Sequence, residues 1–391
     1  MTRKIQSIFA NNIKTAEERD YWLQILSSRQ VKAYNDICYC KTGQLGVNIT
    51  ICEHCGKTVV HNSSCKNRSC PHCQHLKQEE WAEKRLSEVV DADYYHITFT
   101  LPHVLNPLIR YNEPVMYSLL MKTAGHTITN LFKDIYGADG GVIAVLHTWS
   151  QELNFHPHVH CIVPALGLTK SMQIVKGKHK GFLFPVRVLR DVFTGKFLAG
   201  LKELYLDDKL FIPSDENDLS DPKNWKKFID NLYKTKCNPH IKKTFGKKGN
   251  AVKYLSKYVY RTAISDSRIV NVNKDGVTFS VLNEERTAAQ YEIQLPAKEF
   301  IRRFLLHVLP KGFQKVRYYG FLSNRYKNRN LDIIAKLQNR LRSPYRFDGM
   351  TKPEIILEVW NVDITLCPHC HHQGLHEVRH CGPPIIVGVS T

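Results

Sequence analysis

Two runs rich in apolar and β-branched residues, 142–149 and 155–163, are separated by a short polar loop. This pattern predicts the two antiparallel strands of a β-hairpin. The second run contains His158 and His160, and residues two apart in a strand point to the same face of a sheet. The sequence therefore predicts an antiparallel sheet that presents two imidazoles to one metal ion.

A third ligand is expected from the neighbouring strand, because opposing residues of a hairpin share a face. His147, near the end of the first run, joins His158 and His160 in a suitable register. His156 is a weaker candidate, since its Cα would lie about 13 Å from that of His160 along a flat strand. Imidazole ligands with open coordination positions suit Mg²⁺ or Mn²⁺ acting on phosphate, and equally Zn²⁺.

Cysteine pairs near the N-terminus predict a zinc site. Cys52 and Cys55 form one Cys-x2-Cys pair, and Cys70 and Cys73 form another after fourteen intervening residues. This spacing is close to that of a zinc ribbon, in which each pair offers two thiolates to one tetrahedral ion. The surplus candidates nearby are Cys40, His61 and Cys65. For these three residues the alternatives are that they replace one of the four ligands, bind a second ion, or only pack in the interior.

Polar and basic residues lie between the two cysteine pairs. Lys66 and Arg68 suit contacts with nucleic-acid phosphates or bases, so this region is a candidate DNA-binding element. The competing interpretation is a solvated loop around a structural zinc ion.

The composition restricts the class of partner. The chain has 391 residues, a formal net charge of +19 and a pI of about 9.3. Such a basic excess favours a polyanion such as nucleic acid. No run approaches the ~18 apolar residues of a membrane helix, and the first residues lack the apolar core of a signal peptide. We therefore expect a cytoplasmic protein without a membrane partner, whose twelve cysteines are thiols or zinc ligands.

The segment 251–261 has the pattern of a helix with a tyrosine stripe. Tyr254 and Tyr258 are four residues apart and would lie on one helical face. Such a stripe is normally core packing. Here the flanking residues are cations able to stabilise phosphate or phenolate: Lys253, Lys257 and Arg261. Beside a metal site in a basic protein, the pattern favours nucleophilic tyrosines.

A further cysteine pair lies near the C-terminus. Cys367 and Cys370 are candidates for a second zinc site, whose other ligands the sequence does not identify. Upstream, 325–342 predicts a strongly basic helix that faces either DNA or solvent. The remaining expected elements are helices at 15–34, 76–90, 113–135 and 299–309, and strands at 94–102 and 311–319. Thr15, followed by Glu18, predicts a helix-starting capping box.

Several segments resemble, in order, the IS91 family of transposases, which are HUH (His-hydrophobic-His) rolling-circle transposases with two catalytic tyrosines. They are the cysteine segment 62–74, YHITFTLP at 95–102, VLHTWSQELNFHPHVHCIVP at 145–164, the tyrosine segment 254–268 and EFIRRFLLHVLPKGFQKVRYYG at 299–320. The resemblance covers about residues 15–325. A third tyrosine, Tyr260, departs from the paired pattern.

The resemblance implies a chemistry. His158 and His160, with His147 as third ligand, would hold Mg²⁺ or Mn²⁺ on the scissile phosphate of single-stranded DNA at the ends of an insertion sequence. Tyr254 or Tyr258 would attack, leaving a 5′-phosphotyrosine and a free 3′-hydroxyl, and the strand would pass to a target. An HUH replication initiator or relaxase would use the same chemistry, whereas a zinc-ribbon DNA-binding protein without nuclease activity would not need these residues. The oligomeric state stays open.

The resemblance also implies an α+β fold. An HUH nuclease domain with a central antiparallel sheet would span 91–310, with an insertion around 165–250. A zinc-ribbon-like, DNA-binding domain would precede it at 1–90. A basic, largely helical C-terminal region with a small zinc knuckle would follow at 311–391.

Overall fold

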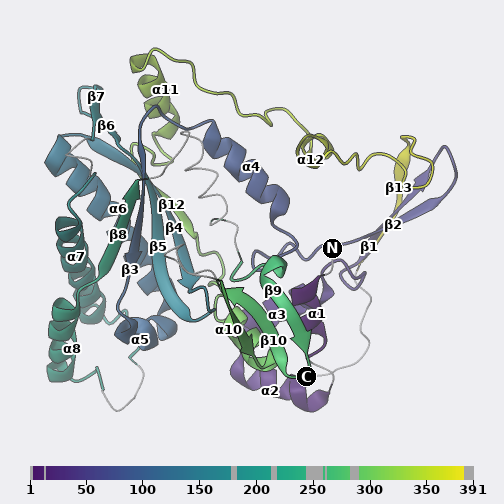
Figure 1. Cartoon of the computed structure of the whole chain (residues 1–391), viewed down its shortest axis with the longest axis horizontal. Coiled ribbons are helices and arrows are strands. Elements are labelled where there is room, and N and C mark those ends of the chain that lie inside the picture. Colours follow the sequence, from purple (N-terminus) through teal and green to yellow (C-terminus); the bar gives the residue numbers. More distant parts are fainter. Residues whose placement is uncertain are drawn as a thin grey trace.

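The computed structural model describes residues 3–12, 15–177, 183–212, 218–243, 259, 262–281 and 290–382 (Figure 1). Within these ranges every strand pair is antiparallel. The expected mixture of helices and strands around a central antiparallel sheet is confirmed. No helix in the described part of the chain is both long and apolar enough to cross a membrane.

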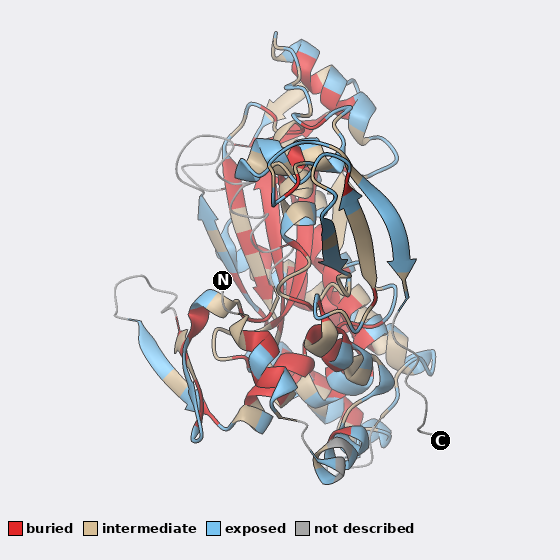
Figure 2. Cartoon of the chain, turned by 90° about the vertical axis from the view of Figure 1, so that its right-hand side faces the viewer, coloured by how far each residue is buried: buried red, intermediate tan, exposed pale blue. Residues whose placement is uncertain are grey.

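A seven-stranded sheet forms the centre of the molecule, in the order β7-β6-β4-β5-β3-β8, with β12 also paired to β4. Its strands are β3 (Tyr94–Thr100), β4 (Asp139–Trp149), β5 (Phe155–Pro164), β6 (Leu166–Leu168), β7 (Ile174–Lys176), β8 (Asn238–Lys243) and β12 (Val316–Gly320). Figure 2 shows buried residues concentrated in these central strands. The predicted hairpin is confirmed as β4 and β5, and the strand predicted at 94–102 is β3.

Helices cover one face of this sheet. They are η1 (His103–Leu105), α5 (Asn106–Tyr111), α6 (Glu113–Tyr136), α7 (Val186–Leu206) and α8 (Pro222–Thr235). Alternate strand residues such as Phe99, Leu146 and Val159 pack into this helical layer. The helix α6 is capped by Gly137, whose φ of 67° is the left-handed conformation that glycine adopts without strain.

The opposite face is partly covered by α4 (His75–Leu86) and α11 (Lys327–Leu337). Leu331 and Ile334 of α11 pack in one buried cluster with Val145 and Ile162 of the sheet. The remainder of this face carries the histidines described below.

A second body packs beside the sheet. It combines α1 (Lys4–Ala10), α2 (Ala16–Ile25), α3 (Ser28–Tyr39) and α10 (Ala297–Leu305) with η2 (Asp266–Arg268), β9 (Ile269–Asn273), β10 (Gly276–Val281) and β11 (Tyr291–Leu295). Phe9, Ile37 and Phe300 share its core, so the first and last thirds of the chain fold together. This cluster crosses residue 90, and the cluster that joins Val145 to Leu331 crosses residue 310; the domain boundaries expected there stay a prediction.

The prediction of one helix at 15–34 is wrong, because the chain leaves helical geometry at Leu26 and starts again after Ser27. The capping box predicted for Thr15 and Glu18 is present. A second capping box, Ser27 with Gln30, starts α3 and explains the break.

A small sheet of order β13-β1-β2 stands apart from both bodies in Figure 1. It consists of β1 (Val47–Cys52), β2 (Thr58–Asn62) and β13 (Leu375–Cys381), and α12 (Lys352–Trp360) lies on the path to β13. We call it the ribbon sheet.

Candidate active site and metal centres

Three histidines of β4 and β5 lie on the sheet face opposite α6 and α7. His147 pairs with His158, and Val145 pairs with His160. Opposing residues share a face, as do residues two apart, so the three imidazoles converge on one region. We call His147, His158 and His160 the histidine centre.

The imidazoles of the histidine centre are close together and buried. One ring nitrogen of each lies within 4.8 Å of the other two. The Nε2 atoms of His158 and His160 are 3.0 Å apart. The exposed fractions are 2% for His147, 9% for His158 and 8% for His160. The structure thus brings together the three candidate ligands, and their role in metal binding stays a prediction.

Hydrogen bonds at the far side of two rings set their orientation. His158 Nδ1–H donates to the carbonyl oxygen of His156 over 2.7 Å. His160 Nδ1 lies 2.8 Å from His96 Nε2, and Thr98 Oγ1 is 3.3 Å from the same Nδ1. Both rings therefore turn Nε2 toward the shared centre, which is how protein histidines are usually held as metal ligands.

Burial keeps His158 and its neighbour His96 neutral. It lowers the pKa of His158 to about 4. Burial, followed by the nearby His240 and Lys242, lowers the pKa of His96 to about 4 as well. At neutral pH the rings of His158 and His96 therefore each retain a nitrogen lone pair.

This donor set fits a divalent ion. Two nitrogens at 2.0–2.1 Å from a metal and at right angles would be ~3 Å apart, which matches the Nε2 separation in the histidine centre. His156, the weaker candidate, contributes its carbonyl oxygen to His158 rather than joining the group.

The wall of the site contains further aromatic and polar groups. The ring of Trp149 stacks on His147, with centroids 4.5 Å apart and an angle of 17°. Beside it, Thr148 Oγ1 lies 3.1 Å from Nδ1 of the buried His307, whose Nε2–H donates to Leu153 O over 3.2 Å. Sequence reasoning singled out none of the supporting residues His96, Thr98, Trp149 and His307. The alternation of 94–100 was the available signal for the first two, because it places them on one face.

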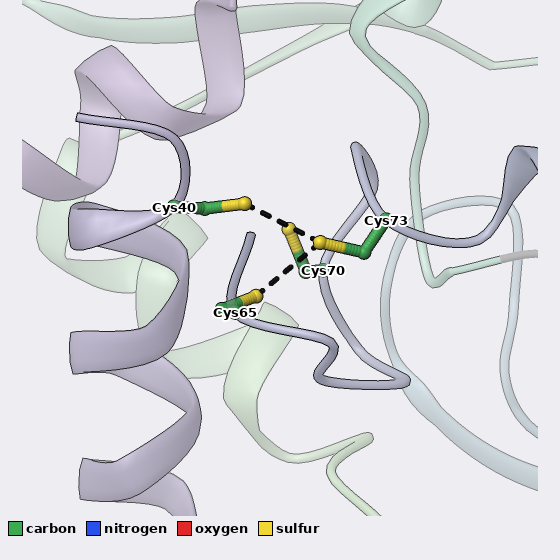
Figure 3. Close-up of side chains that lie close together, drawn as sticks. All are labelled: Cys40, Cys65, Cys70 and Cys73. Atoms are coloured by element: carbon green, nitrogen blue, oxygen red, sulfur yellow. Dashed lines mark hydrogen bonds between the residues drawn. The ribbon is translucent and has the colours of Figure 1, made fainter. Parts of the chain in front are cut away.

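A first cysteine group joins α3 to the coil before α4. Cys40 follows α3, and Cys65, Cys70 and Cys73 come from the coil (Figure 3). The Sγ atom of Cys73 is 3.3 Å from that of Cys40 and 3.5 Å from that of Cys65. Hydrogen bonds from Cys40, Cys65 and Cys70 hold the pKa of Cys73 well below its usual range. Four converging sulfurs fit a tetrahedral zinc ion.

A second cysteine group contains Cys52, Cys55, Cys367 and Cys370. The zinc ribbon expected from Cys52, Cys55, Cys70 and Cys73 is therefore corrected: the structure places the two pairs in different groups. Cys40 and Cys65, which looked surplus, complete the first group, and the C-terminal pair completes the second.

Comparisons with known proteins agree with this architecture. Residues 8–101 match a family model described as "Transposase zinc-binding domain", of the IS91 type, and residues 141–330 match one described as "Putative transposase". The chain is 35% identical over 357 residues to the "Putative transposase y4qJ" of Sinorhizobium fredii (strain NBRC 101917 / NGR234), covering 88% of both chains. The chain belongs to the IS91 family of transposases.

A second relative is more distant. The "Transposase for insertion sequence element IS801" of Pseudomonas savastanoi pv. phaseolicola is 27% identical over 303 residues, which cover 76% of this chain and 71% of that protein. No solved structure matches. The family assignment supports structural zinc in the N-terminal region and DNA as the substrate of this transposase.

The candidate tyrosine segment of the transposase falls almost wholly outside the described residues. This applies to Tyr254 and Tyr258 and to their flanking cations Lys253, Lys257 and Arg261. Val259 is described, is 2% exposed, and belongs to the buried cluster that contains Val145 and Ile162. By strand alternation that cluster lies on the same sheet face as the histidine centre.

The two candidate DNA contacts between the cysteine pairs differ sharply. Lys66 is exposed, with a left-handed φ of 53°. Arg68 instead donates to the carbonyl oxygens of Leu309, Pro310 and Phe313, over 2.9, 2.6 and 2.7 Å. Its guanidinium is therefore engaged within the transposase, and a DNA contact by Arg68 stays a prediction. Lys66 stays a candidate.

Proposed function

We propose that this transposase is an HUH endonuclease that moves its element by a rolling-circle route. It cuts single-stranded DNA at the element ends with a tyrosine nucleophile and transfers the bound strand to a target. The observation that carries the proposal is the histidine centre: three buried imidazoles on one sheet face, with two Nε2 atoms 3.0 Å apart.

The chemistry assigns separate roles to separate groups. Mg²⁺ or Mn²⁺ held by His147, His158 and His160 would polarise the scissile phosphoryl group. Tyr254 or Tyr258 attacks the phosphorus, forming the tyrosyl O–P bond. The P–O3′ bond breaks, the phenol loses its proton and the leaving 3′ oxygen gains one, so the products are a 5′-phosphotyrosine and a free 3′-hydroxyl. The covalent intermediate stores the energy for rejoining, so no nucleotide cofactor is required.

Two features of the chain support pairing the tyrosines with this centre. The four-residue spacing of Tyr254 and Tyr258 is that of one helical face, which suits two successive strand transfers. Val259, next to the second tyrosine, is buried on the sheet face that carries the histidine centre. The net charge of +19 also favours attraction of the DNA backbone.

The test is formation of a covalent adduct. Labelled single-stranded DNA from the element's end is incubated with the full chain and Mg²⁺ or Mn²⁺, and the mixture is separated under denaturing conditions. We expect an adduct that is lost in the double variant Tyr254→Phe, Tyr258→Phe and in His158→Ala. His103→Ala, at an exposed histidine outside the histidine centre, is the matched control and should keep the adduct. An adduct that persists in the double variant would refute the tyrosine assignment.

A further inference from the structure

The ribbon sheet joins two segments that are far apart in the sequence. Its central strand β1 pairs on one side with β2 and on the other with β13, from Val47 opposite Cys381 to Cys52 opposite Leu375. Each of the two segments also contributes one Cys-x2-Cys pair. Cys52 ends β1 and Cys55 lies in the turn between β1 and β2, and the turn before β13 carries Cys367 and Cys370.

The two turns repeat the same backbone geometry. The N–H of Cys52 donates to the carbonyl of Lys57, five residues later, and that of Cys367 donates to His372, again five residues later. Four residues after each first cysteine, Gly56 and His371 return a hydrogen bond to its carbonyl and have positive φ values, 68° and 58°. Such a pair of equivalent knuckles is how a zinc ribbon presents four thiolates to one ion.

The sulfur geometry agrees with a bound ion and not with disulfides. The Sγ atoms of Cys52 and Cys370 are 3.7 Å apart, as are those of Cys55 and Cys367. A disulfide would need about 2.05 Å, whereas sulfurs at ~2.3 Å from a tetrahedral ion would be separated by almost 4 Å. Cys52 and Cys367 are fully buried although the outer strands β2 and β13 are largely exposed.

We propose that Cys52, Cys55, Cys367 and Cys370 form a second structural zinc centre, distinct from the Cys40, Cys65, Cys70 and Cys73 group, that fastens the C-terminal segment 366–382 to the N-terminal zinc-binding domain. The matched zinc-binding family model ends at residue 101, so it does not include the C-terminal pair. The inference is independent of the nuclease chemistry proposed above.

The composition of the ribbon sheet explains why an ion is required. Of the five residues of β2, four are exposed, and so are five of the seven of β13. So little buried surface cannot hold three strands together, and small domains of this kind depend on a metal for folding. The ion thus replaces a hydrophobic core and closes a loop between residues 312 positions apart.

The first test counts zinc in the purified full chain by elemental mass spectrometry. We expect two ions per chain, and one in Cys367→Ser, Cys370→Ser, in Cys52→Ser, Cys55→Ser, and in the variant with all four substitutions. Cys381→Ser is the matched control, because Cys381 lies in β13 but outside both groups, and it should keep two. Two ions retained without Cys367 and Cys370, or both ions lost when only the four are replaced, would overturn the proposal.

A second measurement guards against a general folding defect. Hydrogen exchange of the β13 peptide 375–381 should accelerate at least tenfold in Cys367→Ser, Cys370→Ser, while β3 and β5 keep their protection. Unchanged exchange in β13 would show that no ion holds this strand.

Discussion

His160 Nδ1 lies 2.8 Å from His96 Nε2, across the pairing of β5 with β3. For His160 to offer its Nε2 lone pair to a metal, Nδ1 must carry the proton and donate it to His96. His96 can accept it because burial lowers its pKa to about 4 and the ring is neutral at pH 7. In the proposed metal site, His96 is therefore a positioning residue behind the histidine centre.

Replacing His96 should weaken metal binding without removing a ligand. We expect His96→Ala to reduce Mn²⁺ affinity by roughly 10- to 100-fold, the usual effect of losing a hydrogen bond behind a ligating histidine. His96→Gln keeps a side-chain acceptor and should recover part of the loss. Isothermal titration calorimetry with Mn²⁺ measures the affinity of both variants. His103→Ala is the control, and its Mn²⁺ affinity should equal that of the parent. Equal affinity in the parent and both variants would exclude this role.

Substitutions at Lys66 and Arg68 should affect different properties: DNA binding for Lys66 and stability for Arg68. Arg68→Gln removes the hydrogen bonds to three carbonyl groups in the segment after α10. We therefore expect the free energy of unfolding to fall by about 3 kcal/mol. Lys66→Asn, which tolerates the left-handed backbone, should change stability by less than about 0.5 kcal/mol. It should instead weaken binding to single-stranded DNA and reduce the magnitude of its salt-dependence slope by about 1.

Urea unfolding and DNA titration at several salt concentrations check both variants. The reverse pattern, with a stable Arg68→Gln variant that binds DNA weakly, would support Arg68 as a DNA contact.

The sequence was sufficient where the structure is local. Alternation in 142–149 and 155–163 predicted the β4–β5 hairpin and placed His147 on the face of His158, because a short loop leaves few registers. It did not reveal His96, because the pairing of β3 with β5 is made across a separation of 64 residues. The internal partners of Arg68 were not predicted for the same reason: its carbonyl acceptors follow more than 240 positions later.

The grouping of the cysteines shows even more clearly that contacts between distant residues could not be predicted from the sequence. Spacing favoured Cys52 with Cys70, since both pairs lie within one short stretch. The partner of Cys52 in the structure is Cys370, 318 positions away. No local rule selects among several Cys-x2-Cys pairs in one chain, and strand pairing in the ribbon sheet decides the match.

His307 should make stability depend on pH. Burial lowers its pKa to about 4, although the hydrogen bond to Leu153 O acts in the opposite direction. The unfolded chain takes up this proton near pH 6.5 and the folded chain only near 4, so the stabilisation is complete above pH 6.5 and is lost as the pH falls toward 4. The contribution of His307 to the slope of the free energy of unfolding against pH is at most about 1.4 kcal/mol per pH unit.

His307→Asn provides the comparison. The variant should be less stable than the parent at pH 7. Between pH 6.5 and 4, however, its free energy of unfolding should fall by about 3 kcal/mol less than that of the parent. Urea midpoints at fixed zinc concentration measure the difference, and zinc release at low pH cancels between the two chains. Identical pH profiles would contradict the assignment.

Two helical glycines should respond in opposite ways to the same substitution. A Cβ added to Gly125 in α6 would lie 2.5 Å from the ring of Tyr319, whose hydroxyl is tied to Met121 O over 2.9 Å. The ring cannot yield freely, so Gly125→Ala should cost about 1–3 kcal/mol of stability through overpacking. A Cβ on Gly195 in α7 meets nothing within 4 Å, so Gly195→Ala should gain about 0.5–1 kcal/mol from helix propensity. Urea unfolding of the two variants checks the contrast, and stabilisation of both would show that α6 does not pack closely on β12.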